Sequence, residues 1–575
     1  MFQRRTPHIV AAIFPVMLML CHAVIAAPPD EPLPDPVALR FANEQDNLFA
    51  DGPNVIGVQA RYAGSDRWVE ALPDSYRVEV RGPASRIEDV SRQPRNPFVL
   101  VSDQAGAEVT VRLIAQQASA ERRFRISKPQ MAEPVKLRVD LDRPTHTYTG
   151  LGAGVMFYDN QFNISDELFD WCFQDVDTQI VHALIRPDFE PTNDNDQWQT
   201  LNGDAFDWSA CERLFWILWH AKQRNPDLKV FACLYSPPAW MKANDDTAGD
   251  AGLKDGEQYK LEMAEYIYAF LKHAQWKGTA IDYVCLFNEP DWPHTQDGAH
   301  YASLLDLAKT HVRVRDAIKQ LIDNDPEFNQ HPAYVFPETL GAGSITRSGA
   351  QSDQLAEFVR SGALDHLAAW GVHDYWNTGG YWPVRFNELR RFTEAGDKPI
   401  WMTEWAQRYP KADLASGMEY GQSILNALRL GCSAWMAFEW VHPAANQSGL
   451  ISTQWGEGVP ETRYWRSKAY FVFQQIANTS PAGGKCVSIG ADKDIPTEGL
   501  EYLAIGEDDK LVVHVVNDLP ISRPYTVAGN GLGKPTTAWL TDFQHDFAEQ
   551  AAANSRGHVP PHALLTLEYR VPDQR

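Results

Sequence analysis

The sequence predicts an α/β protein built on a (β/α)8 barrel, with a β-sandwich side domain and an N-terminal Ig-like β-sandwich domain. Between residues 149 and 480, short apolar runs alternate with amphipathic helical stretches. The runs are continuously apolar, which is typical of parallel strands covered on both faces. Eight strand–helix units over about 330 residues indicate the barrel. The eight runs are residues 150–157, 181–186, 229–235, 282–289, 333–338, 368–375, 399–404 and 432–440.

Alternating β patterns flank these runs on both sides. Residues 37–130 contain short period-2 segments separated by turn residues, which predicts a β-sandwich. The tail is again β-rich and contains a predicted hairpin turning at Asp508 and Asp509, and a strand-like segment before the barrel is expected to pair with this tail. The expected domains are residues 37–130 (N-terminal module), 149–480 (catalytic barrel) and 135–148 plus 481–575 (side domain).

The N-terminus has the pattern of a secretory signal peptide. Two arginines precede an apolar run from Ile9 to Ala27, with small residues near Ala26. We expect residues 1–26 to be removed, leaving a secreted, periplasmic or extracellular protein without a stable membrane anchor. A membrane anchor is the alternative, for which the run is short.

The net charge argues against one class of partner, and the cysteine spacing argues against a zinc site and a disulfide framework. The chain has 52 Lys plus Arg against 75 Asp plus Glu, a net charge of −23. Nucleic acid is therefore excluded as an expected partner, because its phosphates would be repelled. The six cysteines after the leader show no zinc-binding or disulfide-framework spacing, and those at 233, 285 and 432 lie in apolar runs, so small buried hydrophobes are expected.

Polar and aromatic residues gather where the predicted strands end, the position that carries the chemistry in such barrels. Carboxylates, Trp, His and Arg at one end are typical of sugar binding and glycosidic chemistry. In chain order the candidates are Asp159, Arg186, Trp240, Asn288, Glu289, Glu338, His373, Tyr375, Glu404, Glu439 and Trp440.

Glu289 and Glu404 form the candidate catalytic pair. Hydrolysis of a glycosidic bond needs an acid for the leaving oxygen and a nucleophile or base on the other side of the sugar. At about 5–5.5 Å separation one carboxylate attacks carbon directly and configuration is retained. The charge on Glu404 would keep Glu289 protonated as the acid. Asn288 is expected to bind the sugar 2-hydroxyl, and Pro290 to hold Glu289 in extended geometry.

Other strand-end residues leave alternatives open. Glu338 and Glu439 are interpreted mainly as partners that hold Arg186 or a tyrosine in place. His373 is either a core histidine or a residue that binds substrate or orients the nucleophile.

Four further residues are candidates for substrate binding. Trp440 either stacks on a sugar face or packs in the core. Asp159 either grips sugar hydroxyls or caps a loop. Trp240 and Tyr375 lie at the expected ends of the third and sixth units and complete the candidate substrate site.

Several motifs resemble glycoside hydrolase family 30, in the clan of retaining (β/α)8-barrel glycosidases, over about residues 135–575. They are "YTGLGAGVMFYDNQF", "LYSPPAWMKAN", "FNEP", "GVHDY", "WMTEWA", "RYWRSKAYFVFQQIANTSPAGGKCV" and "VPPHALLTL". The resemblance implies that Glu289 is the acid/base and Glu404 the nucleophile. Tyr235 departs from the family pattern, which more often has Trp there, and Asp374 interrupts the usual ending of the sixth strand.

The sequence therefore predicts a secreted retaining glycosidase acting on a polysaccharide, oligosaccharide or glycolipid, with no metal and no cofactor. Glucose, galactose, xylose and fucose all remain open as the sugar. One alternative is a catalytically inactive carbohydrate-binding or adhesion protein on the same fold. Another is a metal-dependent hydrolase, which would need clustered His and Asp at the strand ends, where the sequence offers only His373.

Overall fold

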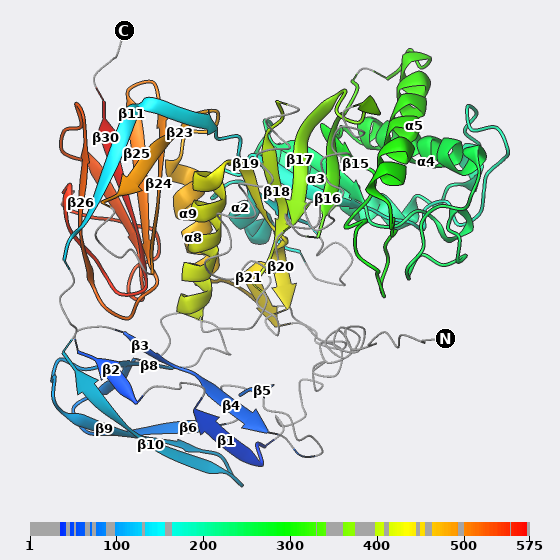
Figure 1. Ribbon diagram of the computed structural model, residues 1–575. Coiled ribbons are helices and arrows are strands. Elements are labelled where there is room, and N and C mark those ends of the chain that lie inside the picture. Colours follow the sequence, from blue (N-terminus) through cyan, green and yellow to red (C-terminus); the bar gives the residue numbers. More distant parts are fainter. Residues whose placement is uncertain are drawn as a thin grey trace, which may run out of the picture.

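The chain folds into a barrel flanked by β-sheet structures, and the predicted fold class is confirmed (Figure 1). The computed structural model describes residues 35–41, 46–50, 53–61, 63, 69–71, 76–87, 98–128, 133–155, 164–328, 330–340, 360–373, 397–407, 413–443, 449–454, 463–492, 499–551 and 554–571. The predicted leader at residues 1–26 lies outside this range.

Eight parallel strands close the barrel in chain order. Each of the apolar runs predicted as strands overlaps one of them, because a continuously apolar run suits a strand covered on both faces. The strands are β12 (Gly150–Gly154), β13 (Ile180–Ile185), β14 (Lys229–Leu234), β15 (Tyr283–Cys285), β16 (Ala333–Thr339), β17 (Leu367–His373), β18 (Ile400–Trp405) and β19 (Cys432–Ala437).

Helices cover the barrel, several of them begun by serine caps. Ser165, Ser303 and Ser467 each accept a hydrogen bond from a backbone N–H in the first helical turn, which satisfies a donor that the helix leaves unpaired. The described helices are α2 (Asp166–Phe173), α3 (Ser209–Arg224), α4 (Glu257–Trp276), α5 (Leu304–Asp323), α8 (Asp413–Leu430) and α9 (Lys468–Thr479), with the 3-10 turns η3 (Gly203–Ala205) and η4 (Ala239–Met241).

Several predicted strands end earlier than expected, and for the fourth and the eighth this moves candidate site residues off the strand. The fourth stops at Cys285, so Asn288 and Glu289 follow the strand instead of closing it. The eighth stops at Ala437, and Glu439 and Trp440 belong to a separate three-stranded sheet. This sheet consists of β20 (Glu439–Pro443), β21 (Gly449–Gln454) and β22 (Arg463–Arg466).

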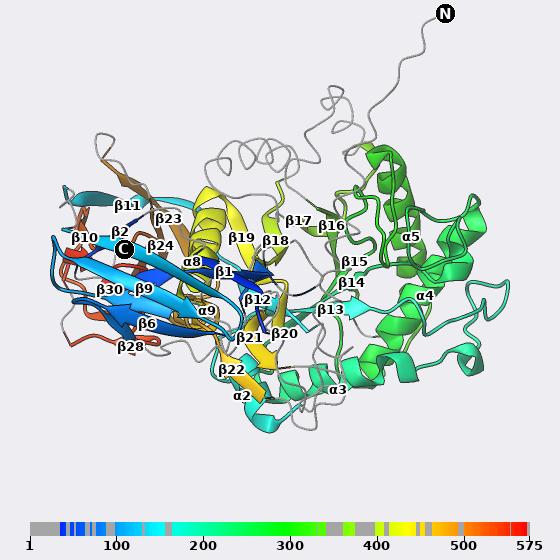
Figure 2. The same ribbon diagram turned by 90° about the horizontal axis from the view of Figure 1, so that it is seen from below.

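A nine-stranded sheet joins segments from both sides of the barrel. β11 pairs antiparallel with β23 and parallel with β26, as expected from the sequence, and the predicted hairpin at Asp508 and Asp509 joins β24 to β25. α8 and α9 lie between this sheet and the barrel (Figures 1 and 2). The strands are β11 (Val135–Thr147), β23 (Lys485–Ala491), β24 (Leu500–Glu507), β25 (Lys510–Asn517), β26 (Arg523–Gly529), β27 (Thr537–Thr541), β28 (Ala548–Glu549), β29 (Arg556–Val559) and β30 (Ala563–Arg570).

The N-terminal part is entirely β in its described residues and has its own core, in which Phe124 and Leu100 are fully buried. Its sheets have the orders β1-β4-β5, β2-β10-β9-β6 and β3-β8-β7. We propose the three domain boundaries given above for the chain. The strands are β1 (Ala38–Phe41), β2 (Asn47–Phe49), β3 (Asn54–Ile56), β4 (Val58–Arg61), β5 (Val69–Glu70), β6 (Arg77–Arg81), β7 (Ser85–Ile87), β8 (Phe98–Val101), β9 (Glu108–Ile114) and β10 (Ser119–Ser127).

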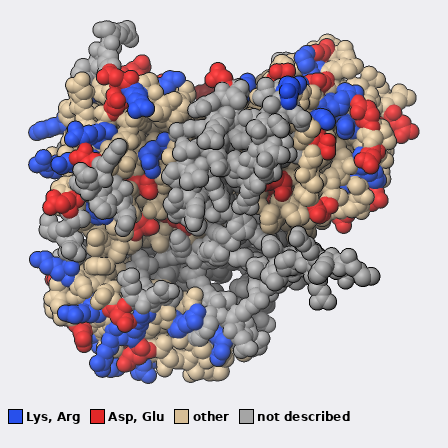
Figure 3. Space-filling model, viewed as in Figure 1, with Lys and Arg blue, Asp and Glu red and all other residues tan. Residues whose placement is uncertain are grey.

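The surface mixes both signs of charge. Acidic and basic side chains are interspersed over the described part of the face in Figure 3. Among the described residues, no helix combines the length and the apolar character needed to cross a bilayer.

Candidate active site

The barrel brings Glu289 and Glu404 together although they are far apart in sequence. Glu404 lies on β18 and Glu289 follows β15, and both side chains are almost fully buried. A carboxylate oxygen of Glu289, one of Glu404 and a ring nitrogen of His373 all lie within 4.8 Å of one another. These three residues are the centre of the candidate site.

His373, at the end of β17, is hydrogen-bonded between two carboxylates. Its Nδ1 lies 2.9 Å from Oε1 of Glu289, and its Nε2 lies 3.0 Å from Oε2 of Glu338. Nδ1 is also 3.9 Å from Oε1 of Glu404. The ring therefore meets carboxylates at both nitrogens and is fully buried.

These contacts decide the protonation of His373. Burial lowers the pKa of a histidine, because the charged form loses its water. Here the charge of Glu404 and the hydrogen bonds with Glu289 and Glu338 outweigh burial and raise the pKa of His373 well above its usual range. The raised pKa favours the imidazolium form, in which both ring nitrogens donate to carboxylates.

The backbone around Glu289 is strained and firmly held. Glu289 has φ 43° and Glu338 has φ 59°, in the left-handed region that residues other than glycine rarely adopt. The Glu289 N–H donates to the carbonyl of Glu338 at 2.9 Å, and the Glu289 carbonyl lies 3.0 Å from Nε2 of His294. The expectation that Pro290 keeps Glu289 extended is wrong. Residues that several contacts hold in a left-handed backbone conformation are typical of functional sites.

Gly371 makes room for Glu338. A Cβ atom at position 371 would lie 1.8 Å from Oε1 of Glu338, far inside van der Waals contact. The absent side chain on β17 therefore lets Glu338 reach His373, two residues further along the same strand. Glu338 is a positioning partner, as predicted, but its partner is His373 instead of Arg186.

Tyr235 is a site residue that the sequence analysis did not select. Its hydroxyl donates a hydrogen bond to Oε2 of Glu404 at 2.9 Å. The residue directly follows β14, so its position was predictable from the strand-end rule. The tyrosine at this position, where the family more often has Trp, was the sequence feature that could have identified it as a site residue.

The remaining described candidates make contacts with other residues. Asn288 is almost fully buried, and its side-chain oxygen is 4.0 Å from the Cys233 sulfur. Arg186 forms a two-pronged ion pair with Asp188, at 2.9 and 2.7 Å. Trp240 is partly exposed, and its Nε1 donates to the backbone carbonyl of Glu190 at 3.0 Å.

Trp440 requires a correction. Its side chain is fully buried and packs edge-on against Phe173 of α2 and Phe473 of α9. The predicted sugar-stacking role is wrong, because β20 turns this ring towards the helices and leaves no face for a ligand. Glu439 is likewise buried at the start of β20. Asp159 and Tyr375 lie outside the described residues.

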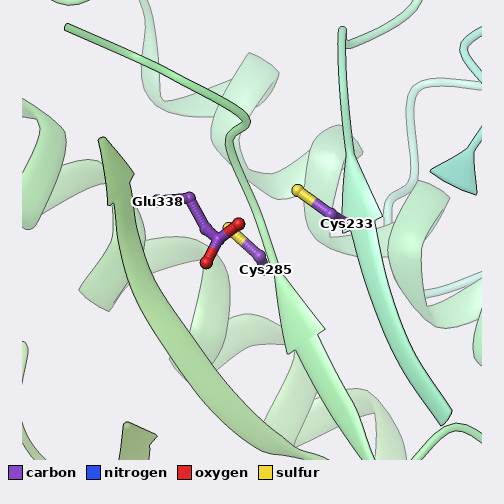
Figure 4. A group of neighbouring side chains, drawn as sticks. All are labelled: Cys233, Cys285 and Glu338. Carbon is purple, nitrogen blue, oxygen red and sulfur yellow. The ribbon is translucent and has the colours of Figure 1, made fainter. Parts of the chain in front are cut away.

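Two cysteines and Glu338 lie close together inside the barrel (Figure 4). Cys233 and Cys285 are aligned neighbours on β14 and β15, and burial raises the pKa of both thiols. They are therefore neutral thiols, and all six cysteines of the described residues are buried and free of disulfides. The expectation that they act as small buried hydrophobes is confirmed.

The Glu289–His373–Glu404 group has the spacing of metal ligands. Each ring nitrogen of His373, however, lies at hydrogen-bond distance from a carboxylate oxygen, and a nitrogen that donates a hydrogen bond has no lone pair for a metal ion. The arrangement is instead suited to holding one protonatable carboxylate beside another that stays charged, as glycosidic chemistry requires.

Residues 194–318 match the family model for O-glycosyl hydrolase family 30. This match to a family model covers 125 of the 575 residues (318 − 194 + 1) and makes this part of the chain similar to glycoside hydrolase family 30. The resemblance stated from the sequence is confirmed, and the protein is an O-glycosyl hydrolase with a carbohydrate substrate. The matched segment includes Glu289, whereas Glu404 lies beyond it. A search of curated proteins found no match.

Several solved structures are similar to this chain in fold. The subfamily 8 xylanase from Clostridium acetobutylicum is 19% identical, with 76% of this chain and 100% of that chain covered and a TM-score of 0.56. The catalytic domain of xylanase C from Talaromyces cellulolyticus is 17% identical, with 76% and 100% covered and a TM-score of 0.60. An exported protein from Bacteroides fragilis is 12% identical, with 75% and 99% covered and a TM-score of 0.62. At these identities the likeness establishes the fold alone.

The first prediction concerns Gly371. Gly371→Ala should lower kcat by about 100-fold or more, because the new methyl group displaces Glu338 and thereby His373, and small misplacements in an active site can have effects of this size. Steady-state kinetics on an aryl glycoside measures it. Gly203→Ala, where the added Cβ meets nothing within 4 Å, is the control and should keep full activity. Equal activity of the two variants would contradict the role of Glu338.

The second prediction concerns the charge on His373. Nitrogen-15 NMR of histidine-labelled protein should show an imidazolium at pH 8, where an ordinary histidine side chain is neutral. His373→Gln assigns the signal by its loss. Because the folded-state pKa is raised, the stability that this proton contributes is complete below about pH 6.5 and is lost as pH rises through the raised value. A neutral ring at pH 7 would contradict the assignment.

Proposed function

We propose that this protein is a secreted retaining glycosidase that cleaves β-linked glycans or β-glycosides by double displacement. The observation that carries the proposal is the close approach of two carboxylates, with one oxygen of Glu289 within 4.8 Å of one of Glu404. Retaining enzymes have carboxyl groups about 5–5.5 Å apart, whereas inverting enzymes leave about 6.5–9.5 Å for a water molecule. The spacing supports direct attack by a carboxylate.

Glu404 is the nucleophile in this proposal and Glu289 the acid/base. Glu404 attacks the anomeric carbon while Glu289 gives its proton to the leaving oxygen, which breaks the glycosidic bond and forms a glycosyl ester. Glu289 then removes a proton from water, and the hydroxide attacks the same carbon and releases Glu404. The hydrogen bond from Tyr235 favours the charged, attacking form of Glu404.

His373 acts as a positioning residue. Its Nδ1–H points at Oε1 of Glu289, which leaves the other carboxyl oxygen to exchange a proton with substrate. When Glu289 has donated its proton, the imidazolium stabilises the resulting carboxylate by a charge-assisted hydrogen bond. Glu338 holds the opposite nitrogen and fixes the ring in this orientation.

Asn288 is proposed to bind the sugar 2-hydroxyl, and Arg186 and Trp240 to line the substrate site. Xylanases and an endo-β1,6-glucanase are among the structural neighbours, which gives the first substrates to test. We also propose that residues 1–26 are a cleaved secretion signal, which N-terminal sequencing of the exported protein would test.

The third prediction tests the nucleophile. Glu404→Ala should lose activity on aryl β-glycosides by about 10⁴-fold or more, since no ester can form, and should regain part of it with azide as an α-glycosyl azide. Product anomeric configuration is read by proton NMR. Glu167→Ala, at an exposed acid on α2, is the matched control and should behave as wild type with and without azide.

The same experiment separates the alternatives. A β-glycosyl azide from Glu404→Ala would reverse the two roles. Full activity of Glu404→Gln would exclude this site. Absence of activity in the wild-type protein on a panel of β-glycosides, β-glucans and xylans would favour a carbohydrate-binding protein instead.

A further inference from the structure

A second group of acids lies away from the candidate active site. It joins the segment after β13 to helix α4. Glu262 and Glu265 are three residues apart on α4, and this spacing puts their side chains on the same face of the helix. One carboxylate oxygen each of Glu262, Glu265 and Asp194 lies within 4.8 Å of the other two.

A fourth acid adds to this negative charge. Glu190 is almost fully buried, and its Oε1 accepts a hydrogen bond from the Asp194 N–H at 3.2 Å. Burial, and then the charges of Asp194 and Glu262, raise the pKa of Glu190 to about 8. Four carboxyl groups therefore meet in a region from which most water is excluded.

Several oxygens of these acids have no donor outside the group. Glu265 is 1% exposed and Glu262 is 5% exposed. Oδ2 of Asp194 accepts a hydrogen bond from the Asn202 N–H. Within the described part of the chain, however, no donor other than the neighbouring acids reaches either oxygen of Glu265, Oε2 of Glu262 or Oδ1 of Asp194. Buried carboxylates without donors are strongly unfavourable, so a ligand that supplies positive charge is expected.

We propose that Asp194, Glu262 and Glu265 bind a divalent cation, with calcium as the ion that fits best. All three ligand groups are carboxylates, which hard cations prefer, whereas zinc favours nitrogen and sulfur. The three oxygens lie within 4.8 Å of one another, close enough for one ion to reach all of them. Calcium takes many carboxylate and other oxygen ligands in a flexible geometry, whereas magnesium usually binds only one or two carboxylates and keeps several waters.

The proposed cation site has a structural consequence for Trp240. The segment that carries Asp194 also carries Glu190, whose backbone carbonyl accepts the hydrogen bond from Trp240. The cation would tie this segment to α4 and thereby help to hold Trp240, one of the residues proposed to line the substrate site. It takes no part in the proposed bond cleavage, because its ligands are separate from Glu289 and Glu404.

A proton shared between Glu262 and Glu265 is the competing arrangement. The shared proton would reduce the negative charge of the two glutamates, so the protein would not need a bound ion for stability. The two arrangements differ in one measurable respect, which is whether the unfolding temperature depends on calcium.

The fourth prediction is therefore a calcium-dependent unfolding temperature. The full-length protein is stripped with EDTA, and its Tm is measured in EDTA and in calcium at about 100 times the dissociation constant. We expect calcium to raise Tm by roughly 5 °C, and magnesium to raise it less. Isothermal titration with calcium should give one ion per chain.

Variants make the test specific. Glu265→Gln should lose most of the calcium shift, yet its Tm in EDTA should equal or exceed that of wild type, because one repelling charge is gone. Asp194→Asn, at a partly exposed position, provides a second variant if Glu265→Gln does not fold. Glu167→Gln, at an exposed acid of α2, should keep the full shift. Equal wild-type Tm in calcium and EDTA, or an undiminished shift in both site variants, would overturn the proposal.

Discussion

The candidate active site depends on one buried histidine held between carboxylates. Closing an eight-stranded barrel brings the strand ends together, and here three of them deliver glutamates to a space with little water. Such charges repel one another strongly unless a cation lies among them. His373 is that cation, and its two ring nitrogens lie at 2.9 and 3.0 Å from the carboxylates of Glu289 and Glu338. The histidine lets the glutamates stay close enough for double displacement.

The local backbone is arranged around these contacts. Glu289 and Glu338 adopt left-handed conformations, each of which is unfavourable by about 1–3 kcal/mol. The hydrogen bond between their backbones holds them, and the missing side chain at Gly371 gives Glu338 its space. The unfavourable backbone conformations of Glu289 and Glu338 are therefore offset by the contacts with His373 that these conformations make possible.

The sequence predicted the parts of this arrangement that depend on local pattern. Apolar runs located the eight strands, and the strand-end rule found Glu289, Glu404 and His373. It could not show which partners His373 would meet, because those contacts join residues from three strands. It also failed for Trp440, since an apolar run does not reveal that β19 ends at Ala437 and that β20 turns towards the helices.

The acids on α4 illustrate a different limit of sequence analysis. Glu262 and Glu265 lie in an amphipathic pattern where glutamates are normally exposed, so their burial becomes visible only in three dimensions. Comparison with the candidate active site then shows what the burial of these glutamates requires. Both clusters gather carboxylates in a dry region, and in one of them the chain itself supplies a cation, His373. Around Glu265 the neighbouring charges that shift its pKa are all acids. The same electrostatic constraint that requires an imidazolium in the barrel therefore requires a cation or bound protons beside α4, and the carboxylate-only ligand set favours a hard metal ion.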